Sequence, residues 1–564
     1  MIPPAKASRS ASWKAALVIF LYGVLVAVLV QPWQEYLVID DWIGAWSVQT
    51  LYQGGRVAFL DWSVHYFLTQ LFWGALFCLP GGFSLGALHV STFVLSLLGL
   101  WAFYGILREL EVRPGIAWIG VFSMAVMPPF FILSLSFAGE VPLWTLMIVA
   151  MYCFIIGQKR QKESLIWWGV LVCVLAFFIR QYAVAPILAL LLYRILNRKR
   201  QYFDFLELLP VLVFGFVCGL LYLVCLTFFG TEAAPALRPM IFYEYYSSYF
   251  ADVLYKSLRG LLNLSLLLSP LTLPLLGLQR IRRHLYGILL VAALCVIGQY
   301  SQDAFPTPLL GTYVFNFHEL GQSRTFLSGE FGTRQLPLWF DEMAVVVSLI
   351  SAGILIVSLG ETLNHYRSLM GDVHLLAFLQ LVFMALLMAL LWQFHDRYYI
   401  WLSPWLILFL CRRPEWTLPR RVVAALLCVP WFVLSVTGTL DHIAHQKILK
   451  QAYDYMTRDE TSPVSPKIID AGFTFNGWYV FAHPEAAAPG ALTRAHVHGV
   501  TTVNERAFWV LAKEDLPGYQ TWKTFSPSVN YWASGSDVDV LFFKIEVREN
   551  KPPKKKKKKK NRNT

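Results

Sequence analysis

Residues 15–30 read AALVIFLYGVLVAVLV and residues 375–391 read LLAFLQLVFMALLMALL, two apolar stretches without a charged residue. A helix needs about 20 apolar residues to cross the hydrocarbon core of a bilayer, and further stretches of this kind follow one another along the chain. Because that core contains no water, each segment must satisfy its own backbone hydrogen bonds, which favours helices over strands. The sequence therefore predicts an all-α polytopic membrane protein.

The composition agrees with this prediction and limits the partners. Hydrophobic residues make up 57% of the 564 residues and charged residues only 15%. The formal net charge falls from +12 to +5 when the seven lysines Lys554–Lys560 are left out, so the protein body is mildly basic and no nucleic-acid partner is expected. The eight cysteines lie in or beside apolar segments without metal-type spacing, and we interpret them as small buried hydrophobes.

Basic residues in short loops predict the orientation, because they are retained on the cytoplasmic side. Placing all the basic clusters on that side predicts about thirteen transmembrane helices, with the N-terminus cytoplasmic and the C-terminus extracytoplasmic. The stretch Tyr66–Leu79 would break the alternation, and we interpret it as an interfacial or re-entrant helix. The first apolar stretch leads into Gln31-Pro32-Trp33 without a small-residue cleavage site, so we expect a retained anchor. The basic clusters are Lys6/Arg9/Lys14, Arg108/Arg113, Lys159/Arg160/Lys162, Arg198/Lys199/Arg200, Arg280/Arg282/Arg283, Arg367 and Arg412/Arg413/Arg420/Arg421.

Three regions follow from these patterns. Residues 1–440 are predicted to form the transmembrane domain, and its long outer loop Ser301–Met343 is expected either to close over substrate or to be a passive surface excursion. Residues 441–550 are predicted to form a small α/β extracytoplasmic domain, with a helix at Ile448–Met456 and a strand at Val538–Ile545. Residues 551–564 are predicted to be a disordered poly-Lys tail, either solvated or attracted to membrane lipids.

Acidic residues follow two of the apolar stretches on the predicted outer face. Asp40 and Asp41 come directly after the first helix, and Glu140 precedes another helix in the next outer loop. Each has a structural alternative, because acids at the first turn of a helix cap it and favour the positive end of its dipole. Charge at the membrane boundary is costly and is typical of functional sites, so these three residues are candidate catalytic residues.

Basic residues at outer helix ends complement the acids. Arg180, Arg397 and His65 are candidate substrate-binding residues, since the positive-inside bias disfavours leaving cations there without a partner. The alternatives are arginines that snorkel toward headgroups and a histidine that only packs. Acids beside cations on one face suit a reaction between a lipid phosphate and a polar acceptor. An acid would remove the proton of the acceptor hydroxyl, and the cations would stabilise the departing phosphate.

At this point the chain resembles the GT-C superfamily of glycosyltransferases, in particular the branch of protein O-mannosyltransferases and lipid A aminoarabinose transferases. The resemblance extends over most of the chain. Its specificity comes from the position of the acidic pair after the first helix and from the order of the loops. The motifs that carry it are Asp40-Asp41, Gly54-Gly55 with Asp61–Leu79, Arg108-Glu109 with Arg113-Pro114, Gly139-Glu140-Val141-Pro142 and Arg397-Tyr398-Tyr399.

The resemblance implies roles for these residues. Asp40 would be the catalytic base with Asp41 as its partner, and Glu140 falls where many relatives carry Asp, which implies a shared carboxylate role. Tyr398, which belongs to the same motif as Arg397, is a further candidate substrate-binding residue. His65 is an approximate positional match for a lysine that binds the donor phosphate in relatives. No cofactor is required, although paired acids can hold a divalent ion, so a metal is left open.

The sequence thus predicts a transferase that moves a sugar, with inversion, from a polyprenyl-phosphate donor to a lipid, glycan or protein acceptor on the extracytoplasmic face. A prokaryotic plasma membrane is the expected location. The main alternative is a transporter or flippase of lipid-linked sugars, which would place charges near the midplane in repeated, broken helices. A non-catalytic scaffold is a third class, and it would tolerate the loss of Asp40.

Overall fold

The protein is described by a computed structural model, which covers residues 9–38, 41–60, 63, 65–197, 208–229, 249–277, 281–302, 338–364, 373–389, 396–458, 469–470, 477–481, 509–512, 519–525 and 543–548. Asp40 and residues 303–337 of the predicted outer loop lie outside these ranges. The chain divides into two compact units. Unit 1 comprises Met1–Ser323 with Thr333–Ile443, and unit 2 comprises Arg324–Gly332 with Ala444–Thr564.

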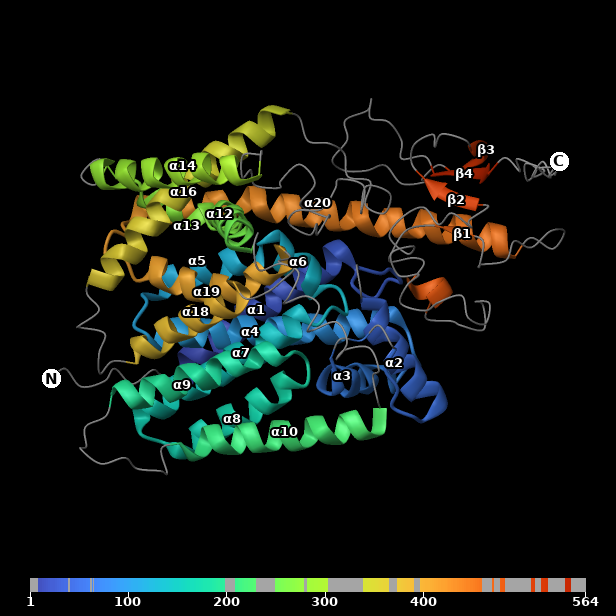
Figure 1. Cartoon of the computed structure of the whole chain (residues 1–564), viewed down its shortest axis with the longest axis horizontal. Coiled ribbons are helices and arrows are strands. Elements are labelled where there is room, and N and C mark those ends of the chain that lie inside the picture. The colour runs from blue at the N-terminus through green and yellow to red at the C-terminus, as the bar shows by residue number, and fades with distance from the viewer. Residues whose placement is uncertain are drawn as a thin grey trace, which may run out of the picture. The chain divides into compact units, whose positions relative to one another are not determined.

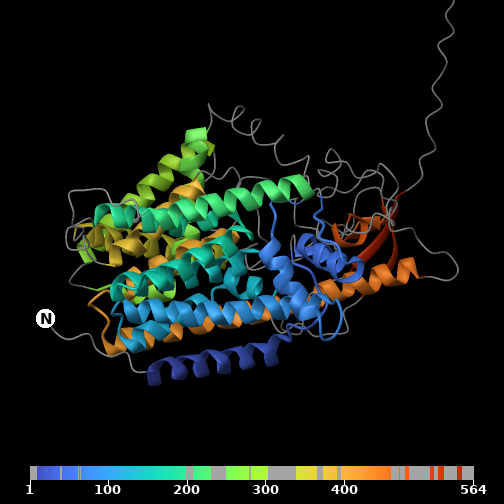
Figure 2. The same ribbon diagram turned by 90° about the horizontal axis from the view of Figure 1, so that it is seen from below.

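Unit 1 is a helical bundle. Helix α4 packs against α7, which in turn packs against α8, and α2 and α3 lie together at one end of the bundle (Figures 1 and 2). The described elements are α1 (Arg9–Val30), α2 (Asp41–Gly54), α3 (Leu68–Cys78), α4 (Leu85–Glu109), α5 (Pro114–Ala125), α6 (Pro128–Ser134), α7 (Glu140–Arg160), α8 (Glu163–Phe177), η1 (Gln181–Ala183), α9 (Val184–Leu196), α10 (Leu209–Phe229), α12 (Tyr249–Leu267), α13 (Ser269–Thr272), η3 (Leu273–Leu275), α14 (Ile281–Gln302), α16 (Leu338–Asn364), α18 (His374–Ala389), η5 (Asp396–Tyr398), α19 (Tyr399–Cys411) and α20 (Leu418–Thr457), whose last residues enter unit 2.

The predicted helical membrane class is confirmed. Within the described residues, seven helices are long and apolar enough to cross a membrane, and up to nine spans result if each of two bent helix pairs counts as one. The pair α5 and α6 bends by 69° at a break followed by Pro128-Pro129, as expected where proline interrupts the helical hydrogen bonds. Five further apolar helices are shorter, among them α3, the predicted interfacial segment. The total of thirteen spans stays a prediction.

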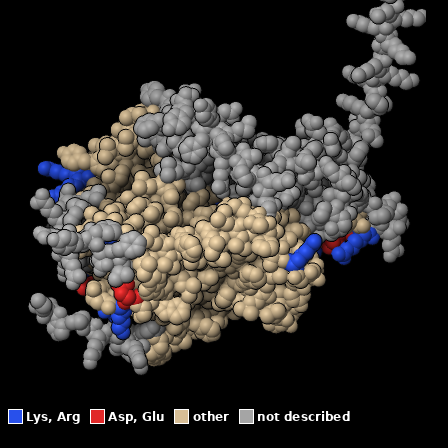
Figure 3. All heavy atoms as spheres, turned by 60° about the horizontal axis from the view of Figure 1, so that its bottom comes forward, with Lys and Arg blue, Asp and Glu red and all other residues tan. Residues whose placement is uncertain are grey.

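The distribution of exposed apolar residues fits a protein surrounded by lipid. Helix α19 is almost wholly buried at the centre, whereas α1 and α10 present large apolar side chains outward, such as Phe20, Phe216 and Phe228. A water-soluble protein rarely exposes apolar area on this scale, but hydrocarbon solvates it without cost. On the face drawn in Figure 3, the described charged residues lie toward the ends, and a broad area between them is covered by other residues.

Ion pairs join neighbouring helices at their ends. Glu109, the last residue of α4, lies 2.8 Å from Arg160 and 3.3 Å from Lys159, both in the last turn of α7. The basic clusters that follow α4 and α7 therefore lie at the same end of the bundle. Which side of a membrane this end faces stays a prediction.

Unit 2 contains the last residues of α20 and a four-stranded sheet. Its strands are β1 (Ile469–Asp470), β2 (Trp509–Ala512), β3 (Tyr519–Phe525) and β4 (Phe543–Arg548), in the order β1-β2-β4-β3, with β1 parallel to β2 and the other pairs antiparallel. A five-residue π-helix spans Gly477–Phe481. The predicted helix Ile448–Met456 lies within α20, and β4 overlaps the end of the predicted strand Val538–Ile545. The domain boundaries at 440 and 550 stay predictions.

Helix α4 and the segment after α1 approach each other very closely at Gly86. A Cβ atom on Gly86, in the first turn of α4, would lie 2.1 Å from the carbonyl oxygen of Trp33. We expect Gly86→Ala to lower the free energy of unfolding by about 1–3 kcal/mol, because the backbone must shift to admit the methyl group. Thermal unfolding of the purified protein in detergent measures this effect.

Gly215→Ala is the matched control, because a Cβ there meets no atom within 4 Å and alanine favours the helix. Equal melting temperatures for the two variants would contradict the close packing at Gly86.

Candidate active site

A buried carboxylate shared by two arginines lies where three helical segments begin. Glu140 is the first residue of α7, Arg180 precedes η1, and Arg397 lies in η5 directly before α19. Oε1 of Glu140 is 2.7 Å from Nη2 of Arg180 and 3.2 Å from Nε of Arg397. The Glu140 side chain is fully buried, and the arginine side chains are only 13% and 7% exposed. Such burial strengthens the attraction between the charges, because little water screens it.

Aromatic rings support this ion-pair cluster. The guanidinium groups of Arg180 and Arg397 lie 5.9 and 5.6 Å from the ring centre of Tyr398, within the range of cation–π attraction. Tyr398 stacks on Trp401 at 4.7 Å, and Tyr182 lies 5.0 Å from Trp401. The rings restrict how the arginine side chains can move, so the two guanidinium groups are held close together.

The segment between α6 and α7, residues Leu135–Gly139, is a buried loop whose carbonyl groups receive side-chain donors. We call it the α6–α7 loop. Tyr36 donates its hydroxyl hydrogen to the carbonyl of Leu135, and Gln70 donates its side-chain N–H to the carbonyl of Phe137. Directly after the loop, the indole N–H of Trp401 donates at 3.2 Å to the carbonyl of Glu140, the first residue of α7. These bonds matter because an unpaired buried carbonyl is costly.

The ring of Phe137 fixes the same loop against the short helices at this end. A Cβ on Gly44 of α2 would lie 3.1 Å from this ring, and one on Gly74 of α3 would lie 2.6 Å from it. Glycines at both positions therefore let α2 and α3 approach Phe137 closely. As a result, the start of α2, which carries Asp41, is packed against the loop that leads into Glu140.

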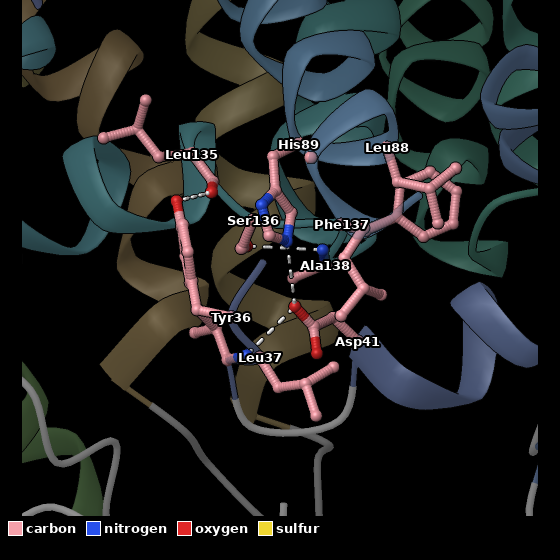
Figure 4. A network of polar contacts seen from close by, with 12 residues as sticks. Tyr36, Leu37, Asp41, Leu88, His89, Leu135, Ser136, Phe137 and Ala138 are labelled. Atoms are coloured by element: carbon pink, nitrogen blue, oxygen red, sulfur yellow. Dashed lines mark hydrogen bonds and ion pairs between the residues drawn. The ribbon is translucent and has the colours of Figure 1, made fainter. Parts of the chain in front are cut away.

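Asp41 lies in a second polar network beside this loop (Figure 4). Its side chain is almost fully buried, and Oδ2 accepts the backbone N–H of Val38 at 3.0 Å. The same oxygen lies 3.9 Å from Nε2 of His89, a fully buried residue of α4. The ring of His89 packs on Tyr36, with 4.3 Å between the ring centres. We call the described residues Tyr36, Leu37, Val38 and Asp41 the acid turn.

Burial, and secondarily the nearby Asp41 carboxylate, raises the pKa of the Tyr36 hydroxyl well above its ordinary value. The hydroxyl therefore keeps its proton at any physiological pH and remains a donor to Leu135. On the other side of the turn, Nε2 of His442 donates to the carbonyl of Leu37 at 2.8 Å, which assigns the N–H to that ring nitrogen. The acid turn is thus fixed both to the α6–α7 loop and to α20.

The structure brings several of the predicted residues together. Glu140, Arg180, Arg397 and Tyr398 form one cluster, and Asp41 lies beside the loop that precedes it. His65 packs edge-on against Phe67, 6.0 Å between ring centres, and its role in donor binding stays a prediction. Asp40 lies outside the described residues, so its role also stays a prediction.

Sequence reasoning missed His89, Tyr36, Gln70 and Trp401, which hold the site together. One available signal was His89 itself, an ionisable residue within an apolar helix, where such residues are costly and often functional. The side-chain donors to the α6–α7 loop carried no signal, because their partners are backbone carbonyls far away in the chain.

The described residues contain no group of three or more His, Cys, Asp or Glu side chains that could hold a metal ion. Because Asp40 lies outside these residues, the metal question stays open. What the described site offers chemically is a pair of buried guanidinium groups close together. Guanidinium binds phosphate and carboxylate with paired hydrogen bonds, so the cluster suits an anionic group at the membrane boundary.

Comparison with known proteins gives a family for part of the chain. Residues 64–222 match the family model described as dolichyl-phosphate-mannose-protein mannosyltransferase. This segment contains His65, His89, Glu140 and Arg180. The resemblance to glycosyltransferases that the sequence predicts is confirmed on this match. No curated protein matches the sequence.

Solved structures of GT-C glycosyltransferases also resemble the chain. ArnT from Cupriavidus metallidurans in the apo state matches with a TM-score of 0.42 and 12% identity, covering 96% of this chain and 98% of ArnT. The structure of the same protein bound to undecaprenyl phosphate matches with a TM-score of 0.39 and 11% identity, and the match covers 94% of this chain and 97% of ArnT. The oligosaccharyltransferase of Archaeoglobus fulgidus, tethered to an acceptor peptide, matches with a TM-score of 0.45 and 12% identity. This match covers 96% of this chain and 76% of the oligosaccharyltransferase.

Removal of the shared carboxylate tests the ion-pair cluster. We expect Glu140→Ala to destabilise the protein by about 3–5 kcal/mol, because two buried guanidinium groups lose the charge between them. Thermal unfolding in detergent measures the loss.

Glu109→Ala is the matched control. It also removes a carboxylate that contacts two basic residues, but Lys159 and Arg160 are 36% and 50% exposed, so we expect a loss of about 0–1 kcal/mol. A loss for Glu140→Ala no larger than that for Glu109→Ala would contradict the buried cluster.

Proposed function

We propose that this protein is a membrane glycosyltransferase that transfers a sugar from a polyprenyl-phosphate donor to a hydroxyl group of a lipid, glycan or protein acceptor. The observation that carries the proposal is the Arg180–Glu140–Arg397 cluster at the helix ends, next to the loop that holds the acid turn. The family match over residues 64–222 supports the same reaction class, since that family is named for a mannosyl donor on dolichyl phosphate.

Arg180 and Arg397 are proposed to bind the phosphate of the donor. In the transfer, the bond between the anomeric carbon and the phosphate oxygen breaks, and its electron pair leaves with the polyprenyl phosphate. Guanidinium groups already fixed near this oxygen would stabilise the added charge without reorganising. Glu140, predicted as a carboxylate of the active site, would act here by keeping the two guanidinium groups close together.

Asp40 is proposed to be the general base. An acceptor hydroxyl is a poor nucleophile until its proton is removed, and a carboxylate within hydrogen-bond reach can accept that proton as the new bond forms. Asp41 already accepts the N–H of Val38 and lies beside His89, so we assign its carboxylate a structural role in the acid turn. A single displacement at the anomeric carbon would invert its configuration.

A flippase or transporter of lipid-linked sugars is the second candidate. It would use charged residues near the membrane midplane in discontinuous helices. The cluster here lies at the starts of α7, η1 and α19, and this position favours chemistry at a membrane surface. We further propose a plasma membrane of a prokaryote, with the cluster on the extracytoplasmic face, and catalysis without a resident metal, which an activity assay with a chelator would test.

Replacing the proposed base tests the reaction. We expect Asp40→Asn to lower kcat by about 10²–10⁴-fold, because the amide cannot accept the hydroxyl proton. The measurement is the transfer of sugar from radiolabelled polyprenyl-phosphate donors by purified protein in nanodiscs, with a panel of donor sugars.

Glu163→Gln serves as control, since it removes an acid whose side chain is 68% exposed at the start of α8. Full activity of Asp40→Asn would remove the proposed base. Movement of intact donor across proteoliposomes without a transfer product would favour the flippase.

A further inference from the structure

Trp401 is a buried tryptophan at which the three segments of the ion-pair cluster meet. It lies in the first turn of α19, and the residue is only 1% exposed. Its indole N–H donates to the carbonyl of Glu140 at the start of α7. Its ring stacks on Tyr398 of η5 and lies against Tyr182 of η1, with 4.7 and 5.0 Å between the ring centres. One side chain therefore contacts every segment that supplies a charge to the cluster.

The hydrogen bond from the indole of Trp401 joins α19 to α7 and is not part of either helix. A carbonyl in the first turn of an α-helix already accepts the N–H four residues further on, so the indole is a second donor to a group that the helix itself satisfies. A buried indole N–H without a partner is costly, and a shift of α19 relative to α7 would break this bond. The bond therefore fixes the backbone of Glu140, whose carboxylate lies between the two arginines.

The aromatic rings carry the same restraint to the arginines. Tyr398 lies nearly parallel to Trp401, with 13° between the ring planes. The guanidinium groups of Arg180 and Arg397 lie 5.9 and 5.6 Å from the centre of the Tyr398 ring. Tyr182 follows Arg180 by two residues, so its contact with Trp401 holds the segment from which Arg180 extends. A phosphate bound by two guanidinium groups needs them at a fixed spacing, because hydrogen bonds weaken steeply when their geometry changes.

We propose that Trp401 is a positioning residue of the donor-phosphate site, which sets the spacing between the guanidinium groups of Arg180 and Arg397. This inference rests on the proposed function, in which these arginines bind the phosphate of the donor. Because the indole is buried, it acts through Glu140 and Tyr398 and does not touch the donor. Loss of its N–H should therefore weaken binding of the phosphate group and leave binding of the polyprenyl chain unchanged.

The experiment compares wild type with Trp401→Phe, which retains an aromatic ring and removes the indole N–H. The ligands are polyprenyl phosphate and polyprenol, which has the same chain with a hydroxyl group in place of the phosphate. We expect Trp401→Phe to bind polyprenyl phosphate about fivefold more weakly, the usual contribution of one hydrogen bond. Its affinity for polyprenol should equal that of wild type, whereas a general loss of structure would weaken the binding of both ligands.

Trp416→Phe is the matched control. Trp416 is also 1% exposed, and its indole N–H donates at 2.9 Å to the carbonyl of Leu410 in the last turn of α19. This variant loses the same kind of buried bond at the other end of the helix, so we expect wild-type affinity for both ligands. Wild-type affinity of Trp401→Phe for polyprenyl phosphate, or an equal loss in the two tryptophan variants, would contradict the proposal.

Tyr182→Leu tests the same restraint if Trp401→Phe does not fold. It removes the ring that links the indole to the segment of Arg180, and Tyr182 is partly exposed, so the substitution leaves no fully buried space empty. We expect about threefold weaker binding of polyprenyl phosphate, which is typical of the loss of one aromatic pair, and unchanged binding of polyprenol. Unchanged affinity for polyprenyl phosphate would contradict the restraint.

The double variant of Trp401→Phe with Arg180→Gln tests whether the indole acts through the arginine. If it does, the loss of affinity for polyprenyl phosphate in the double variant is smaller than the product of the two single losses. Losses that multiply would show independent effects and contradict the proposal.

A transfer assay on the same protein separates this inference from the proposed function. A wild-type protein that binds polyprenyl phosphate more tightly than polyprenol but transfers no sugar from any donor would contradict the proposed function, and the binding results would still decide the role of Trp401. Equal wild-type affinity for the two ligands would contradict the phosphate site, and with it both proposals.

Discussion

The site depends on the need to satisfy the backbone of the α6–α7 loop inside a helical membrane bundle. Outside a helix, buried carbonyl groups have no internal partner, and each must receive a donor from elsewhere. Tyr36 supplies one at Leu135 and Gln70 supplies one at Phe137, and Trp401 donates to the carbonyl of Glu140, the first residue of α7 directly after the loop. Because these donors come from the first loop, from α3 and from α19, the loop joins distant parts of the chain at one place.

Two polar networks result on either side of this loop. On one side, Arg180 and Arg397 converge on the buried Glu140 above the ring of Tyr398. On the other side, Asp41 lies beside His89 at the start of α2. A reaction at a lipid phosphate needs both kinds of group, cations for the leaving phosphate and an acid for the nucleophile. The loop gives a physical reason why the two sets of residues remain near each other.

Much of the helical fold and part of this site could be predicted from the sequence. Long uncharged stretches such as Ala15–Val30 are sufficient to predict membrane helices. The alternation of basic loops predicted from the sequence alone that Glu140, Arg180 and Arg397 lie on the same side of the membrane. The number of spans could not be predicted in the same way. The break before Pro128-Pro129 bends α5 against α6, so two helices can form one span. Helices as short as α3 fall below the length that defines a membrane span, so helix length does not decide how they are counted.

The contacts that assemble the site were beyond sequence reasoning for a physical reason. His89 and Asp41 lie in different helices, and Tyr36 and Leu135 are 99 residues apart. Periodicity and composition describe neighbours along the chain, whereas these partners are set by how the helices pack. Position in a loop was enough to select Arg397 as a candidate, but it gave no indication that Arg397 and Arg180 share one carboxylate oxygen.

The most direct test of this account is the affinity of the purified protein for polyprenyl phosphate without a sugar, measured for wild type and for Arg180→Gln, Arg397→Gln and Asp40→Asn. The account predicts that each arginine variant binds at least about tenfold more weakly, as expected for the loss of a charged hydrogen bond to phosphate, while Asp40→Asn binds like wild type. Wild-type affinity in both arginine variants would contradict the assignment of the Arg180–Glu140–Arg397 cluster as the phosphate site.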